Sequence, residues 1–165
     1  MARLPWPDYF MHIVDLVRER STCLRRHVGA LAVRDNRILA TGYNVVPQGL
    51  THCLDLGCLR QKLAIPSGQR HEICRGLHAE QNVIIQAASY GISIQGADIY
   101  TTTYPCVLCC KMLINCRVRH IYYAECYPDE LSQSMLQEAG IPVTQIAIPN
   151  ADPSPSAACD HVGQS

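Results

Sequence analysis

Two short motifs carry the side chains with the clearest chemical potential in this sequence. One is His78-Ala79-Glu80, and the other is the run Pro105–Cys109, which reads Pro-Cys-Val-Leu-Cys. One imidazole and two thiolates suit zinc, and three protein ligands leave a fourth tetrahedral position open, as in catalytic zinc sites. We therefore predict His78, Cys106 and Cys109 as zinc ligands, with Glu80 as the catalytic acid–base residue beside them.

The chemistry available to such a set is hydrolytic deamination. Zinc lowers the pKa of its bound water towards 7, and Glu80 could carry that water's proton to a ring nitrogen and then to the departing amine. The order H-x-E followed by P-C-x-x-C is the signature of zinc-dependent nucleobase deaminases. A purely structural zinc site, or unrelated buried cysteines, would need neither Glu80 nor Pro105, and here Pro105 follows Glu80 by 25 positions.

The spacing within each motif constrains the elements that present it. Cys106 and Cys109 are three apart, so they share one face in the first turn of a helix, where the helix dipole favours thiolates. His78 and Glu80 are two apart and would diverge by about 200° on a regular helix. The pair can act together only if His78 stands at the very start of its helix.

The remaining sequence predicts an α/β fold in one domain, residues 1–149, followed by a disordered Pro-, Ser- and Ala-rich tail, residues 150–165. Asp8 is a candidate N-cap for the first helix, and residues 45–77 form a long irregular segment that needs something to hold it. The strand-helix-strand-helix-strand order from residue 98 predicts parallel pairing. The predicted helices are 9–20, 78–90, 106–115 and 129–139; the predicted strands are 28–33, 37–43, 97–103, 119–124 and 141–148.

Composition narrows the function classes. The chain has 165 residues, 48% of them apolar, with 14 basic and 14 acidic side chains. Zero net charge argues against a dedicated binder of long nucleic acid, and no apolar run approaches the roughly 18 residues of a membrane span. Ten cysteines without a signal-like N-terminus predict a reducing, cytoplasmic location in which cysteines serve zinc.

Beyond the zinc motif, the chain resembles the deoxycytidylate (dCMP) deaminase family, in its bacterial and phage branch, over roughly residues 6–148. The resemblance implies a three-layer α/β/α sandwich with a five-stranded mixed sheet, the cytidine deaminase-like fold. It also implies zinc-dependent conversion of dCMP to dUMP, supplying thymidylate synthesis, in a homo-oligomer (hexamer or dimer). The stretches that carry it are 6–11, 20–23, 28–30, 42–44, 78–82, 100–102, 105–109 and 122–125.

The same resemblance assigns further residues. Asn44 is expected to bind the sugar of the substrate, Tyr127 to help form the pyrimidine pocket, and Ala79 to contact the substrate. Many members respond to dCTP and dTTP, with Mg, near a Gly-Tyr-Asn-Gly turn. This chain has Val45 at the last position of that turn, and it also departs from the pattern at Pro128 and 114–116. We therefore predict weakened or absent dCTP activation.

The segment 45–77 contains cysteines and histidines that the catalytic motif does not use. Relatives in the family often hold this segment with a second, structural zinc, so we predict Cys23, Cys53 and Cys74 as ligands, with Cys58 or His71 as the fourth. Free thiols in a mobile loop are the simpler alternative. Cys110 and Cys116 are interpreted as packing residues, and Cys159 and His161 in the tail are assigned no function.

Three functions thus remain for comparison. The first is deamination of free dCMP; the second is another nucleobase deaminase of the same fold, acting on dCTP or tRNA adenosine. The third is a non-catalytic, zinc-stabilised interaction protein, which would have no use for Glu80. The basic run Arg25-Arg26-His27 could reach a 5′-phosphate or form a solvated surface.

Overall fold

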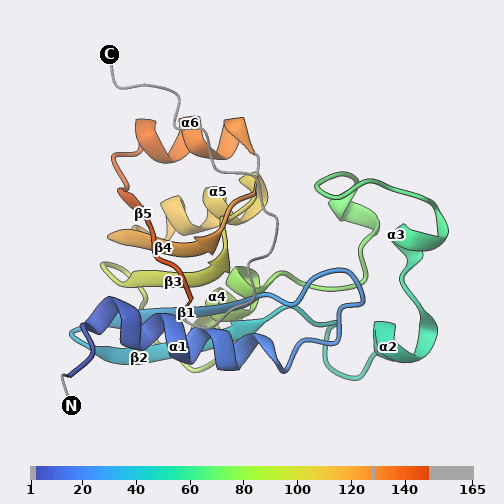
Figure 1. The fold of residues 1–165 in the computed structure, drawn as a ribbon, viewed down its shortest axis with the longest axis horizontal. Coiled ribbons are helices and arrows are strands. Elements are labelled where there is room, and N and C mark those ends of the chain that lie inside the picture. Colours follow the sequence, from blue (N-terminus) through green and yellow to red (C-terminus); the bar gives the residue numbers. More distant parts are fainter. Residues whose placement is uncertain (1–2, 128, 149–165) are drawn as a thin grey trace.

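A computed structural model describes residues 3–127 and 129–148 (Figure 1). The predictions made for Pro128 and for the tail, residues 150–165, lie outside these residues. Among the described residues, no helix is both long and apolar enough to cross a lipid bilayer.

A five-stranded mixed sheet forms the centre of the fold, in the order β2-β1-β3-β4-β5. β1 pairs antiparallel with both β2 and β3, whereas β3, β4 and β5 run parallel to one another. The predicted hairpin and the predicted parallel pairing are both confirmed. The strand bounds are β1 Gly29–Arg34, β2 Arg37–Tyr43, β3 Asp98–Thr103, β4 His120–Glu125 and β5 Val143–Gln145.

Helices cover both faces of the sheet, which gives the predicted three-layer α/β/α sandwich (Figure 1). Alternate strand residues face opposite sides, as the period of two requires. Leu31 and Tyr100 pack under helix α1, Trp6–Arg18, while Ala30 and Ile99 face the other layer. That second layer consists of α4 (Ala79–Ser89), α5 (Val107–Asn115) and α6 (Glu130–Glu138).

Two predicted elements differ from the structure by three residues at one end. Helix α1 begins at Trp6, three residues earlier than predicted, because Pro5 precedes it as the N-cap and Pro7 fits its first turn; Asp8 lies inside that turn and caps nothing. The last strand is limited to Val143–Gln145, whose side chains are all exposed. β5 is an edge strand with pairing on one side only, so the longer apolar pattern did not extend it.

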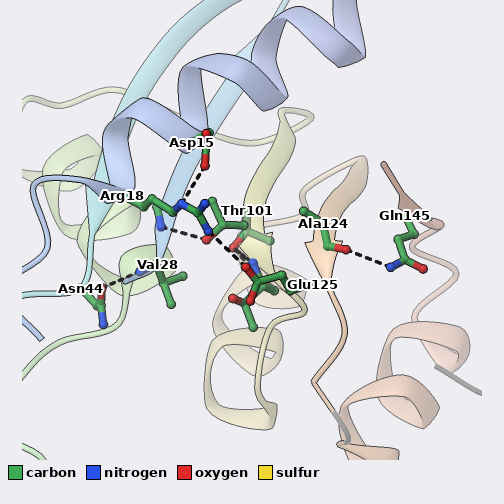
Figure 2. Close-up of polar contacts among 11 residues, drawn as sticks. Asp15, Arg18, Val28, Asn44, Thr101, Ala124, Glu125 and Gln145 are labelled. Atoms are coloured by element: carbon green, nitrogen blue, oxygen red, sulfur yellow. Dashed lines mark hydrogen bonds and ion pairs between the residues drawn. The ribbon is translucent and has the colours of Figure 1, made fainter. Parts of the chain in front are cut away.

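An ion pair joins the end of α1 to the end of strand β4. Arg18 forms ion pairs with Asp15, at 2.7 Å, and with Glu125 at the end of β4, at 3.1 Å (Figure 2). Gly29 lies so close to α1 that a Cβ there would be 2.5 Å from the carbonyl oxygen of Val14. These contacts fix α1 against the carboxyl ends of the strands.

The segment between β2 and α4 is less irregular than predicted. It contains α2 (Cys53–Leu56), α3 (Leu59–Lys62) and the 3₁₀ turn η1 (His71–Ile73). Figure 1 shows α2 and α3 to one side of the sandwich. The segment is closed at its base by an antiparallel bridge between Val45 and Leu77. We call residues 45–77 the insertion.

The start of α4 is positioned by strand β2. A Cβ on Gly42 would lie 2.2 Å from the carbonyl oxygen of Ala79, so only glycine permits this approach. The side chain of Asn82 donates to the carbonyl of Tyr43 at 2.8 Å, and Gln86 accepts from the amide of Thr41 at 2.6 Å. β2 therefore sets where the first residues of α4 lie.

Candidate metal centre and pocket

Three of the predicted side chains converge on one point. The Nδ1 atom of His78 lies 3.3 Å from the Sγ atom of Cys106 and 3.3 Å from that of Cys109. Bonds of about 2.0 and 2.3 Å to one tetrahedral zinc ion would separate N and S by about 3.5 Å. Across residues 3–127 and 129–148, this is the sole group of three ligand atoms within 4.8 Å of one another, and its chemistry and spacing fit zinc.

Helix starts deliver all three ligands. His78 is the N-cap of α4, in extended backbone conformation, and its amide donates to the side chain of Gln81 at 2.8 Å. Cys106 is likewise the N-cap of α5, with Cys109 in the first turn. The prediction that His78 stands at the very start of its helix is confirmed. Because both helices begin beside strand ends, the ligands meet at the carboxyl edge of the sheet.

Hydrogen bonds, neighbouring charges and burial shift the pKa values of the side chains in this centre. A hydrogen bond from the Cys109 thiol and contact with His78 hold the pKa of Cys106 at about 3, so this sulfur is a thiolate. The same bond raises the pKa of Cys109, with burial adding to the effect. Burial opposes charge on His78, but the Cys106 thiolate and Glu80 raise its pKa overall.

Glu80 lies within the centre itself. It is only 4% exposed, and its Oε2 atom is 3.5 Å from the sulfur of Cys109. Burial is the main cause that raises the pKa of this carboxyl group, with the Cys106 thiolate adding to it and His78 opposing it. A carboxyl group whose pKa is raised towards neutral pH is suited to acid–base work.

A cavity of about 140 Å³ opens onto this centre, with His78, Glu80 and Cys106 in its wall. Four buried polar atoms in its lining have no hydrogen-bond partner among the described residues: Arg60 Nε, His71 Nδ1, Thr103 Oγ1 and Tyr127 Oη. Buried polar groups are nearly always satisfied. The cavity is therefore built for a polar ligand.

Cationic side chains form another part of the cavity lining. Arg25, Arg26 and Arg60 all line it, and within the described parts of the chain none of the three has a carboxylate partner. Arg26 lies over the ring of Tyr127 at 5.8 Å, whereas Arg60 is 8% exposed. Arg60 donates to the carbonyls of Pro66 and Gln69, but these neutral groups do not balance its charge. A buried charge is unfavourable unless an opposite charge neutralises it, which favours an anionic ligand.

The residues assigned by resemblance also line this cavity. Ala79 is fully buried and Tyr127 is half-buried. The side chain of Asn44 is held by the backbone. It accepts from the amide of Val28 at 2.8 Å (Figure 2). It also donates to the carbonyl of Arg26 at 2.8 Å. Asn44 thus lies in the cavity wall directly after β2, and its contact with a sugar stays a prediction.

The cysteines of the predicted second zinc approach one another without closing into a tight set. Burial raises the pKa of Cys53, and the next contributions come from the thiols of Cys23, Cys58 and Cys74. These four cysteines also line the cavity. His71 packs edge-on against His78, with ring centroids 5.0 Å apart. Of the two candidates for the fourth ligand, Cys58 is the one near the other thiols.

Arg60 and Thr103 are the residues that sequence reasoning missed. Arg60 is a basic residue in an irregular stretch, and nothing in its surroundings signals that its side chain is buried against the carbonyls of Pro66 and Gln69. Thr103 could have been found, because it ends a buried strand at the edge where the zinc ligands follow.

Comparison with known proteins identifies the family. Residues 4–125 match the family described as "Cytidine and deoxycytidylate deaminase zinc-binding region". The chain belongs to this family. The matched region runs from before α1 to the last residue of β4, so it includes His78, Glu80, Cys106 and Cys109.

Relatives within the family extend the match. The chain is 40% identical to ComE operon protein 2 of Bacillus subtilis over 149 residues, covering 90% of this chain and 75% of that protein. It is 36% identical to the deoxycytidylate deaminase of Schizosaccharomyces pombe, covering 89% of this chain but only 46% of that enzyme.

A solved structure in the family has the same fold. It is the dCMP deaminase of cyanophage S-TIM5, described in complex with dCMP and dUMP, with a TM-score of 0.73 and 28% identity. The match covers 88% of this chain and 100% of the phage chain. The predicted cytidine deaminase-like fold is confirmed.

Proposed function

We propose that the protein catalyses zinc-dependent hydrolytic deamination of dCMP to dUMP, with release of ammonia. The observation that carries the proposal is the buried Glu80 carboxyl group beside a His/Cys/Cys set, at a cavity with unpaired polar and cationic groups. Relatives named deoxycytidylate deaminase, and the phage enzyme described with dCMP and dUMP, support this choice of substrate.

The proposed roles follow from the positions of the side chains. His78, Cys106 and Cys109 hold zinc, which when bound supplies a Lewis acid that makes water a nucleophile near neutral pH. Glu80 takes one proton from the attacking water and delivers it to the ring nitrogen next to the reacting carbon. Glu80 then transfers the second proton to the departing amine, so that the C–N bond breaks as the C=O bond forms.

Recognition of the rest of the nucleotide is assigned to the cavity wall. Tyr127 and Ala79 border the base, Asn44 stands towards the sugar, and Arg25, Arg26 and Arg60 supply positive charge for the 5′-phosphate. A guanidinium pairs with phosphate through up to two parallel hydrogen bonds. This distribution favours a free nucleotide over cytidine or an uncharged base.

A substrate panel tests the function. We expect ammonia release from dCMP at a far higher kcat/KM than from deoxycytidine or dCTP, and none from tRNA adenosine. Glu80→Gln should lower kcat by about 10²- to 10⁴-fold while zinc content stays unchanged. The matched control is Glu72→Gln, which alters an exposed carboxylate in η1.

Other outcomes of this panel lead elsewhere. Equal turnover of dCMP and dCTP would reassign the substrate. A protein that binds zinc but releases no ammonia from any compound in the panel would be the non-catalytic, zinc-stabilised interaction protein.

Three further features belong to this proposal. A second zinc, held by Cys23, Cys53, Cys58 and Cys74, orders the insertion; the support is that these four thiols line one cavity and that the other three contribute to the raised pKa of Cys53. Activation by dCTP is weak or absent because of Val45. The protein acts in the cytoplasm as a homo-oligomer, and the exposed leucines Leu54, Leu56 and Leu63 of the insertion are candidates for subunit contact.

A further inference from the structure

The start of α6 contacts the turn that carries Cys106. One carboxylate oxygen of Asp129 accepts from the amide of Val107 at 2.8 Å, and the other accepts from the amide of Ser132 at 2.9 Å. Asp129 is the N-cap of α6, while Val107 is the first residue of α5. A single carboxylate therefore lies between the first turns of two helices.

A second contact holds the other side of the same turn. The hydroxyl group of Ser132 donates to the carbonyl of Pro105 at 2.8 Å, and its oxygen is 2.6 Å from the sulfur of Cys110. Ser132 is fully buried. The peptide groups before and after Cys106 are thus both hydrogen-bonded to α6, one through Pro105 and one through Val107.

Helix capping alone does not account for this arrangement. An N-cap aspartate needs one oxygen for its own helix, and the bond from Asp129 to Ser132 satisfies that need. The bond to Val107 joins residues 22 apart, and the bond from Ser132 to Pro105 joins residues 27 apart. A buried hydroxyl on α6 is unfavourable without a partner, and Pro105 provides that partner.

We propose that Asp129 and Ser132 are positioning residues that hold the backbone around Cys106 so that its sulfur stays in place for zinc. The inference rests on the proposed zinc site. Removing a group that hydrogen-bonds to a metal ligand and orients it typically lowers metal affinity by about 10- to 100-fold. Within the described residues, no other side chain from a neighbouring helix hydrogen-bonds to the backbone of residues 105–107.

Zinc release tests the inference. Asp129→Ala and Ser132→Ala should release the catalytic ion to a chelator about 10 to 100 times faster than the wild-type protein, well below the unfolding temperature. Loss of deaminase activity in the same sample identifies which ion is leaving. Asp129→Asn keeps one acceptor oxygen and should fall between the wild type and Asp129→Ala; this conservative variant also serves if Asp129→Ala does not fold.

Matched controls come from the same helix. Glu130→Ala and Ser134→Ala remove an exposed carboxylate and an exposed hydroxyl group near the start of α6, and both should release zinc at the wild-type rate. Cobalt substitution gives a second measurement: the thiolate-to-cobalt absorption bands should shift in Asp129→Ala and Ser132→Ala and stay unchanged in the controls.

The outcomes separate this inference from the proposed function. If the variants lose thermal stability but release zinc at the rate of the controls, with unshifted cobalt bands, Asp129 and Ser132 only pack α6 and the inference is overturned. If the wild-type protein holds no zinc at His78, Cys106 and Cys109, the proposed function itself fails.

Discussion

Val45 is the residue on which the proposed loss of dCTP activation rests. Its amide donates to the carbonyl of Leu77 at 3.3 Å, and its carbonyl accepts from the amide of Leu77 at 2.9 Å. Both of its backbone polar groups are therefore engaged, and its β-branched side chain stands where glycine would admit close approach of a phosphate.

The prediction for Val45 concerns effectors. The curve of initial rate against dCMP concentration should be hyperbolic. It should change little when dCTP or dTTP is added with Mg. The substrate curve without effector is the reference. A sigmoidal curve that dCTP makes hyperbolic would show that valine at this position does not block activation.

At the residue scale, local spacing predicted that His78, Glu80, Cys106 and Cys109 lie together. His78 and Glu80 are two apart, and only a helix start lets both face one point, so their placement followed from geometry. Arg60 was not predictable in this way. Its burial depends on how the insertion folds back on itself, because its partners are the carbonyls of Pro66 and Gln69.

At the scale of elements, a close contact joins the insertion to Tyr127, which follows β4. Gly68 has φ of +81°, and a Cβ there would lie 2.6 Å from the hydroxyl oxygen of Tyr127. Both residues line the cavity. The insertion therefore forms a wall of the cavity opposite the strand ends.

Gly68→Ala should disturb substrate binding more than stability. Forcing an alanine to positive φ costs about 1–2 kcal/mol, and the new methyl group would also push Tyr127. Misplacing a substrate-positioning group by about 1 Å can reduce the reaction rate by up to about 100-fold. Because Tyr127 is proposed to contact the substrate, we expect KM for dCMP to rise by about tenfold or more, measured by steady-state kinetics.

The control for Gly68 lies in the same insertion. Gly49 has φ of +86° and nothing within 4 Å of an added Cβ, so Gly49→Ala should lose comparable stability with KM unchanged. Equal KM values in the two variants would mean that the contact with Tyr127 does not shape the pocket.

Element boundaries were predicted where packing and capping agree. The hairpin and the helix start at His78 follow from local pattern, because turn residues and apolar periodicity point the same way. The contact of Gly68 with Tyr127, 59 positions apart, and the shortness of β5 depend on tertiary neighbours. A single sequence holds no local signal for either.

At the scale of the whole molecule, the insertion is a segment of 33 residues whose order depends on few contacts. Its short helices α2 and α3 stand to one side of the sandwich (Figure 1) and have no fully buried apolar side chain. Metal binding can supply the folding free energy that such a segment lacks. The position of the pocket wall would then depend on a metal that takes no part in the chemistry.

Zinc content tests this dependence. The intact wild-type protein should contain about two zinc ions per chain. Cys53→Ser should contain about one, because the thiols of Cys23, Cys58 and Cys74 all contribute to the raised pKa of Cys53. In Cys53→Ser, the insertion should become sensitive to proteolysis and KM for dCMP should rise, since Arg60 and Gly68 belong to it. Elemental analysis and limited proteolysis measure both effects.

Two further variants sharpen this experiment. Cys116→Ser removes a half-buried thiol at the end of α5, away from the insertion, and should keep both ions. His71→Ala and Cys58→Ser distinguish the two candidates for the fourth ligand. His71 packs on His78, so zinc content should stay near two in His71→Ala. Cys58 contributes to the raised pKa of Cys53, so zinc content should fall in Cys58→Ser. One zinc per chain in the wild-type protein would eliminate the second site and leave the insertion to be ordered by its own contacts.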